Sequence, residues 1–303
     1  MKRFVLAMAL VMFSVPAWAD YQAGIYAFKR GDYATALAEF RPLAEQGNAK
    51  AQFVLGLMYA RGQGVAKEYA QAAKWYRKAA GQGYAKAQTN LGIMYENGRG
   101  VRRDYAQAVE WYRKAAGQGI ALAQSNLGFM YANGDGVARD YAQAAKWWRK
   151  AAGQGNAWAQ NGLGDMYYNG RGVAKDYGQA VEWYRKAAGQ GDAGAQNNLG
   201  DMYANGQGVD RDLRKALNLY RSAAATGNEA ATKKYAEIKE QLDSEKKQRE
   251  IDAAFKLAIP KDIFFNRAKD AKKISPQAEG QKKFSRKFAA SKIAEAFPRY
   301  IKN

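Results

Sequence analysis

Two patterns in the sequence contain residues that could carry out chemistry. Asp165 and Asp201 are 36 residues apart, and a pair of carboxylates can act as the acid and the base of a glycosidase. Ser244 and Lys247 lie three residues apart, so a helix would place the lysine one turn from a serine nucleophile. The chain contains 0 His and 0 Cys. This composition excludes His-activated nucleophiles, His or Cys zinc sites, His-ligated haem and disulfides.

The surroundings of both patterns argue against catalysis. Ser244 and Lys247 lie in a charged segment without the S-D-N and K-T-G sequences that accompany S-x-x-K in enzymes. Nothing distinguishes the environments of Asp165 and Asp201 as an acid and a base. The Gly-x-Gly sequences lack the Lys-Ser/Thr of a phosphate-binding loop. We therefore expect a protein that is not an enzyme, with no catalytic residue, no cofactor and no metal.

A 36-residue repeat determines where all these residues lie. Ala-Gln recurs at positions 51, 87, 123, 159 and 195, and Leu-Gly recurs at positions 55, 91, 127, 163 and 199. Five units cover residues 51–230. Self-similarity at a fixed period predicts an array of stacked units, each of which buries its apolar face against the next.

Each unit has the pattern of a helical hairpin. In the second unit the inward residues of the first helix have 3/4 spacing: Ala87, Leu91, Met94 and Tyr95. Asn97-Gly98 predicts the end of that helix, and Asp104 is placed to cap the next one. The inward residues of the second helix are Ala108, Trp111, Tyr112 and Ala115. The sequence therefore predicts an all-α fold, a solenoid of stacked hairpins with a C-terminal helical extension.

These features resemble a known family. L-G-x-x-Y followed by Ala, an aromatic residue and Ala resembles the tetratricopeptide repeat, and the 36-residue period with A-Q…W-Y-R-K-A-A-x-x-G resembles its Sel-like (SLR) branch. The resemblance implies a right-handed solenoid and adaptor or regulatory work on a partner protein. It also implies an alternative, because penicillin binding has been proposed for cysteine-rich Sel-like proteins. This chain lacks their cysteines.

One face of the first helices varies between units. In tetratricopeptide-like solenoids this helix lines the concave groove, so we interpret the variable face as a groove for an extended peptide or a partner helix. The alternative is that these residues pack against the neighbouring first helix, above all Ile93 and Phe129. The candidate partner-binding residues are Val54, Leu57, Asn90, Ile93, Leu122, Asn126, Phe129, Trp158, Asp165, Asn198 and Asp201.

The two ends of the chain differ from the array. Lys2-Arg3, an apolar run over 4–15 and Ala17-Trp-Ala19 predict a signal peptide over residues 1–19 that is cleaved after Ala19. Residues 20–50 read as a degenerate hairpin, residues 229–260 as a capping helix and residues 261–303 as a basic-aromatic tail. The chain carries a net charge of +20.

These features together predict a periplasmic or secreted scaffold. We expect a monomer without a transmembrane segment that binds another protein or peptide and no nucleic acid. A second alternative is that the basic tail binds an anionic lipid or glycan of the envelope.

Overall fold

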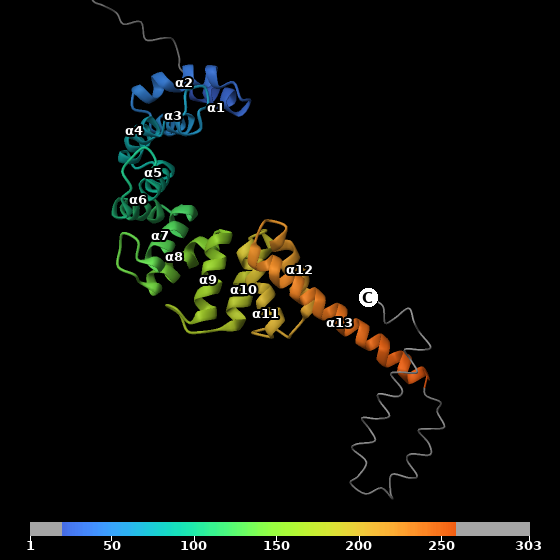
Figure 1. The fold of residues 1–303 in the computed structure, drawn as a ribbon. Coiled ribbons are helices and arrows are strands. Elements are labelled where there is room, and N and C mark those ends of the chain that lie inside the picture. The colour runs from blue at the N-terminus through green and yellow to red at the C-terminus, as the bar shows by residue number, and fades with distance from the viewer. Residues whose placement is uncertain (1–19, 259–303) are drawn as a thin grey trace, which may run out of the picture. The chain divides into compact units, whose positions relative to one another are not determined.

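The regular elements of the chain are helices. The computed structural model describes residues 20–258, except the side chains of residues 255–258, and that part contains no strand. Its helices are α1 (Tyr21–Lys29), α2 (Tyr33–Glu45), α3 (Ala49–Arg61), α4 (Tyr69–Gly81), α5 (Ala85–Asn97), α6 (Tyr105–Gly117), α7 (Ala121–Asn133), α8 (Tyr141–Gly153), α9 (Ala157–Asn169), α10 (Tyr177–Gly189), α11 (Ala193–Asn205), α12 (Leu213–Ala224) and α13 (Glu229–Ala258) (Figure 1).

The helix ends follow from the residues at them. Asp104 begins α6, and its carboxylate accepts a hydrogen bond from the Gln107 backbone N–H at 3.0 Å. Gly98 ends α5 in the left-handed conformation, with φ +67°. A side chain on Gly100 would overlap the backbone of Tyr69 in the preceding hairpin, so this loop packs on its neighbour. The predicted end of α5 and the predicted cap of α6 are confirmed.

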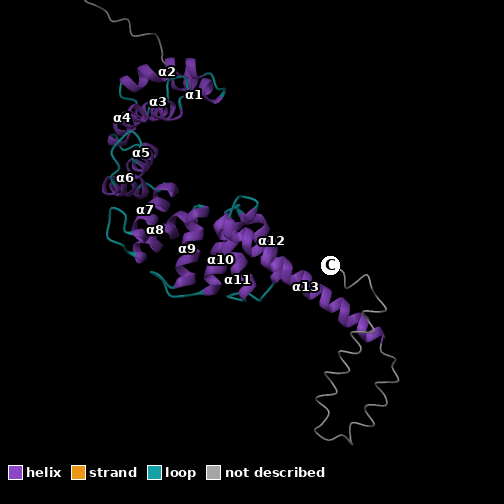
Figure 2. Ribbon diagram, viewed as in Figure 1, coloured by secondary structure: helices purple, strands orange, loops and turns teal. Residues whose placement is uncertain are grey.

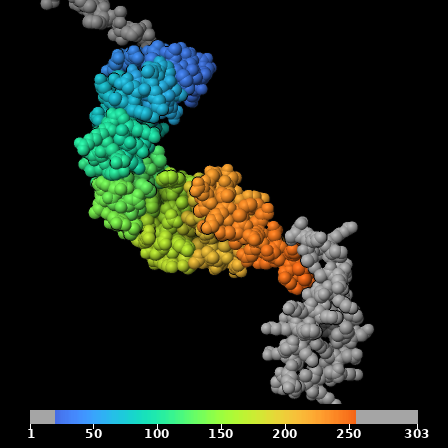
Figure 3. Space-filling model, viewed as in Figure 1, coloured from blue at the N-terminus to red at the C-terminus, as the bar shows by residue number. Residues whose placement is uncertain are grey.

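Consecutive helices pack as hairpins, and the hairpins pack in series. Each of the pairs from α1–α2 to α11–α12 is in contact, and the second helix of each hairpin contacts the first helix of the next. Figures 2 and 3 show these helices following one another in chain order. The hairpins α3–α4 to α11–α12 are called repeats 1 to 5 below. The predicted fold, an all-α solenoid of stacked hairpins, is confirmed.

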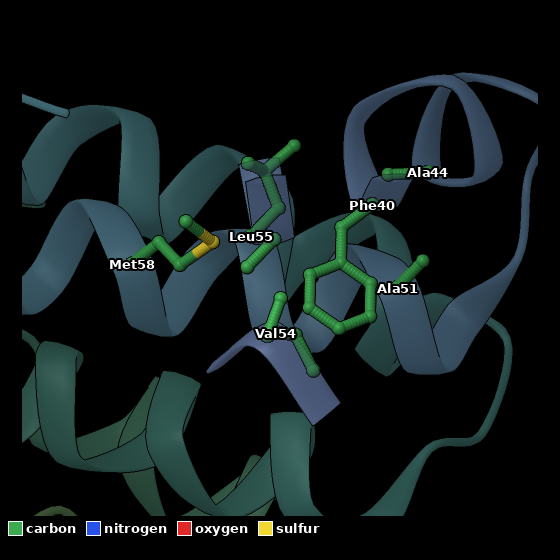
Figure 4. Packing of buried hydrophobic residues seen from close by; sticks show 8 residues of the cluster. Phe40, Ala44, Ala51, Val54, Leu55 and Met58 are labelled. Atoms are coloured by element: carbon green, nitrogen blue, oxygen red, sulfur yellow. The ribbon is translucent and has the colours of Figure 1, made fainter. Parts of the chain in front are cut away.

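The core consists of small residues alternating with one large ring per hairpin. In repeat 2, a Cβ added to Gly92 would lie 2.6 Å from the ring of Tyr112, so the glycine is needed for the ring to fit. Alanines such as Ala108 and Ala123 are fully buried between helices. Phe40, Val54 and Leu55 belong to the first core cluster, which joins α1–α2 to repeat 1 (Figure 4).

The chain divides into two units after Thr232. In the second unit, the described part of α13 is mostly exposed and carries pairs such as Lys246–Glu250 at 3.9 Å. No helix within residues 20–258 is both long and apolar enough to cross a membrane. The predicted signal peptide and the predicted tail over 261–303 lie outside the described residues.

Candidate functional site

The basic residues of the second helices serve contacts between and within repeats. Repeats 1 to 4 each contain an Arg-Lys sequence, called the R-K pair: Arg77-Lys78, Arg113-Lys114, Arg149-Lys150 and Arg185-Lys186. The Lys of each pair lies over the Trp three residues before it, with Nζ 4.1 to 4.6 Å from the ring centroid. Each Arg donates to a Tyr hydroxyl of the following repeat, as Arg113 does to Tyr131 at 3.0 Å. Much of the positive charge of the array is therefore explained without a ligand.

The prediction for Trp111 needs correction. We expected Trp111 to point inward together with Tyr112. Tyr112 is fully buried, whereas Trp111 is half-buried against the core cluster between α4 and α5. Its ring also carries Lys114, with Nζ 4.3 Å from the centroid. The single large core ring is therefore the residue after the Trp in repeats 1 to 4, and in repeat 5 it is Tyr220, which follows Leu219.

The glutamines of the Ala-Gln motifs form a buried ladder. Gln88 donates to the Ala80 carbonyl at 3.1 Å, and its Oε1 accepts from the Gln118 amide at 2.8 Å. The same pair of bonds recurs at Gln52, Gln124 and Gln160. In repeat 5 the donor position holds Thr226, and the buried Oε1 of Gln196 has no hydrogen-bond partner among the described residues. These glutamines link the repeats and are not available to a partner.

Asp165 and Asp201 are parts of the core hydrogen bonds of their own repeats. The hydroxyl of Tyr184 donates to Asp165 Oδ1 at 2.7 Å, and that of Tyr220 donates to Asp201 Oδ1 at 2.8 Å. Asn198 Nδ2 also donates to Asp165 Oδ1, at 3.2 Å. Burial raises the pKa of Asp165 above its ordinary value, and the hydrogen bond from Tyr184 opposes this shift. Both carboxylates thus serve to satisfy buried tyrosines.

The other candidate groove residues divide by exposure. Val54 is buried with an exposed fraction of 6%, so it belongs to the core and not to an open groove. Asn90 and Asn126 hydrogen-bond the hydroxyls of Tyr76 and Tyr112. The residues that are half-buried are Leu57, Asn90, Ile93, Asn126, Asp165, Asn198 and Asp201.

Three candidates form an exposed apolar cluster. Leu122 and Phe129 lie two turns apart on α7, with exposed fractions of 47% and 38%. Trp158 on α9 is 69% exposed, and its ring centroid lies 6.5 Å from that of Phe129. The helices α7 and α9 contact each other directly. We call Phe129 and Trp158, together with the aliphatic Leu122 on the same surface, the aromatic cluster.

A pocket of about 610 Å³ opens beside the aromatic cluster, between repeats 3 and 4. Phe129 and Trp158 line it together with the core ring Trp148 and the bare backbone of Gly162. Trp148 donates its Nε1–H to the Ser125 carbonyl at 3.0 Å, which fixes the orientation of the indole. The pocket therefore has aromatic walls, one of which is held rigidly.

Two arginines give this pocket its charge. Arg139 and Arg171 line it from the loops before α8 and α10, and both are exposed. The guanidinium of Arg171 lies 5.6 Å from the ring centroid of Tyr141, and a hydrogen bond with Arg139 lowers the pKa of the Tyr141 phenol. Among the described lining residues the single carboxylate is Asp165. The arrangement suits a ligand with an apolar group and a negative charge.

Sequence reasoning missed Trp148, Arg139 and Arg171, and it placed Gly162 on the variable face without selecting it as a binding residue. A signal was present, because repeat 3 has Trp148 where the other repeats have Tyr, and repeat 4 has Gly162 where repeats 2, 3 and 5 have Asn. These two departures from the repeat meet at the pocket.

The remaining candidate chemistry finds no support in the described geometry. Ser244 and Lys247 are both exposed on α13. Within residues 20–258 no three His, Cys, Asp or Glu side chains are grouped so that they could hold a metal ion.

Comparison with known proteins agrees with the repeat architecture. The model of the Sel1 repeat matches residues 49–84, 85–120, 121–156, 159–192 and 193–228. A protective antigen of uropathogenic Escherichia coli with an SLR fold is 44% identical over 74% of this chain, with a TM-score of 0.68. This chain covers 49% of that protein, about half its length. A Sel1 repeat protein from Oxalobacter formigenes is 40% identical over 72% of this chain and 86% of its own, with a TM-score of 0.68. No match is found among curated proteins.

Proposed function

Because this chain belongs to the Sel1 repeat family, we propose that it is a non-catalytic scaffold that binds a partner protein or peptide along its first helices. The inner faces of the hairpins are occupied by core residues, and the R-K pairs and Ala-Gln motifs serve contacts between and within repeats. The residues left for recognition are those that differ between repeats. They lie mainly on the first helices.

The observation that carries this proposal is the aromatic cluster. The exposed large hydrophobic residues of the described part are Tyr26, Leu122, Phe129, Trp158 and Ile251. Three of these five lie on α7 and α9, which contact each other, whereas Tyr26 and Ile251 are isolated on α1 and α13. Apolar side chains gathered on a surface beside a pocket are typical of a protein-binding site.

The proposed place of action is the periplasm or the exterior of a bacterial cell. The proposal rests on the sequence of residues 2–19, which has the basic, apolar and small-residue order of an export signal. An enzymatic role is less well supported, because Ser244 and Lys247 are exposed on a charged helix and both candidate aspartates are bound to tyrosines. The envelope-binding alternative depends on residues 261–303, which the structure does not describe.

Site-specific photocrosslinking in cells tests the proposal. A photoreactive amino acid is introduced at Leu122 or Phe129, and at the exposed Lys74 on α4 as the matched control. We expect one protein to be captured from Leu122 and Phe129 and not from Lys74. Capture of the same mixture at all three positions, or of nothing, would contradict the proposal.

A further inference from the structure

We propose that the pocket between repeats 3 and 4 is a specificity site for an extended peptide segment in which an aromatic or bulky aliphatic side chain is followed closely by an acidic residue. This inference rests on the proposed function and adds the chemical identity of the ligand. It is carried by two paired departures from the repeat, by the exposed rings and by the charge of the lining.

Two residues that depart from the repeat line the pocket. In repeats 1, 2 and 4 the core ring is a tyrosine and the residue fourteen positions on is an asparagine, as with Tyr112 and Asn126. In repeat 3 the ring is Trp148 and the residue fourteen positions on is Gly162. A Cβ at Gly162 would lie 3.0 Å from the indole carbons of Trp148. The indole therefore fills the space beside Gly162, and both residues line the pocket, with Trp148 9% exposed.

The exposed rings supply the walls for an apolar side chain. Phe129 and Trp158 stand on neighbouring helices with their rings inclined at 43°. Their centroids are 6.5 Å apart, within the range in which aromatic rings attract one another. An aromatic or aliphatic side chain seated beside Trp148 would bury part of all three rings. Such a central, well-packed side chain supplies most of the affinity in protein recognition.

The charge of the lining selects an acidic neighbour. Arg139 and Arg171 are exposed at the pocket, whereas the carboxylate of Asp165 is turned toward Tyr184 and Asn198, which both donate to it. A guanidinium binds a carboxylate through two parallel hydrogen bonds, so the two arginines favour Asp or Glu in the ligand. The net charge of +20 on the whole chain acts in the same direction over longer distances.

A peptide fits this lining better than a neutral glycan. A glycan could stack on Trp158, but a neutral one would form no charge-assisted hydrogen bond with the two guanidinium groups. Asn169 uses its Nδ2 on the Asp165 carbonyl at 2.9 Å, which leaves its amide oxygen as an acceptor for a peptide N–H at the pocket. The observations therefore favour a peptide over a sugar.

Peptide display on the purified chain tests the inference. A random heptapeptide phage library is selected against the native chain, and enriched peptides are synthesised with a fluorescent label for anisotropy measurements. We expect the enriched sequences to share an aromatic or bulky aliphatic residue within three positions of Asp or Glu. A neutral chito-oligosaccharide is measured in parallel as the glycan probe.

Two double variants assign the binding to the pocket. Trp148→Tyr with Gly162→Asn replaces two lining residues of the pocket by the core pair of repeats 1, 2 and 4, and circular dichroism checks that the fold is kept. Arg139→Gln with Arg171→Gln removes the charge. We expect each to weaken binding of the enriched peptides about tenfold or more. Arg103→Gln, at the position of Arg139 one repeat earlier, is the matched control and is expected to leave binding unchanged.

Three results would overturn the inference: no enriched peptide, equal affinity in the native chain and both double variants, or binding of the neutral chito-oligosaccharide in place of peptides. If peptides bind outside this pocket while crosslinking at Leu122 and Phe129 still captures one protein, this inference fails and the proposed function stands. If crosslinking captures no protein, the proposed function itself fails.

Discussion

The indole of Trp148 packs tightly against the backbone of Gly162. A Cβ at Gly162 would meet the indole carbons at 3.0 Å, and the equivalent residues in repeats 2, 3 and 5 are asparagines. The junction between repeats 3 and 4 is therefore built from a larger ring and a smaller partner than its neighbours. The two substitutions compensate each other in volume.

This compensation predicts a coupled effect on stability. Gly162→Asn alone overpacks the junction and should lower the free energy of unfolding by about 1–3 kcal/mol. Adding Trp148→Tyr should restore most of that loss, because it recreates the pair found in repeat 2. Urea unfolding of both single variants and the double variant gives the coupling energy. Gly153→Ala, at a position with open space around it, is the control and should not destabilise the chain.

The core ring of each repeat should matter more than the tryptophan before it. Tyr112 is fully buried, so Tyr112→Ala should cost about 3–5 kcal/mol of unfolding free energy. Trp111 is half-buried and partly covered by Lys114, so Trp111→Ala should cost less. Chemical denaturation of the two variants compares them directly. An equal or larger loss for Trp111→Ala would show that the ring carries more of the packing than its exposure indicates.

The sequence was sufficient to predict the hairpins and their stacking, because residues that begin and end helices recur in each of the five repeats. Asp104 and Gly98, for example, mark helix ends through local hydrogen bonding and backbone conformation, which need no knowledge of the neighbours. Periodicity placed Trp111 and Tyr112 both on the inner side, since adjacent residues differ by only about 100° around a helix. Which of the two is fully buried depends on the close approach of Gly92, a tertiary contact.

The candidate site was less predictable for the same reason. Phe129 and Trp158 stand out as large apolar residues at variable positions, but so do Val54 and Ile93, which the structure places in or against the core. The spacing of residues along a helix predicts the face on which a side chain lies. It does not predict whether a neighbouring helix covers that face. The arginines of the pocket come from loops, whose side chains a helical period does not place.

The buried carboxylate of repeat 4 predicts a pH effect with a definite sign. Burial raises the pKa of Asp165 above 3.8, so the folded chain binds a proton more tightly than the unfolded chain. Stability from this group is present below the unfolded pKa and is lost as the pH rises through the folded pKa. Asp165→Asn keeps an acceptor for Tyr184 and should remove this loss.

Urea unfolding of both chains at about pH 4 and about pH 7 measures this effect, because the stability from a group with a raised pKa is lost as the pH rises. We expect the native chain to lose stability relative to Asp165→Asn between the two pH values. A difference between the chains that does not change with pH would show that Asp165 has the same proton affinity folded and unfolded. Asp140→Asn, which alters an exposed N-cap carboxylate in the neighbouring repeat, is the control for a simple loss of charge.

The glutamine ladder predicts both a loss and a gain. Gln88→Ala removes the hydrogen bonds with the Ala80 carbonyl and the Gln118 amide, and the loss of the two bonds together should cost about 1–3 kcal/mol. The ladder ends at Gln196, whose Oε1 has no partner among the described residues because position 226 is threonine.

Thr226→Gln supplies the missing donor one repeat after Gln190. Since a buried acceptor gains its hydrogen bond, the variant should be more stable by about 0.5–1.5 kcal/mol. The same change in a Gln196→Ala background should give no gain, because the acceptor is then gone. Thermal and urea unfolding of the four chains therefore isolate the contact between the new amide at position 226 and Gln196 as a coupling energy. A gain that persists without Gln196 would instead arise from the helix end at Thr226, whose hydroxyl donates to the Ala223 carbonyl at 2.8 Å.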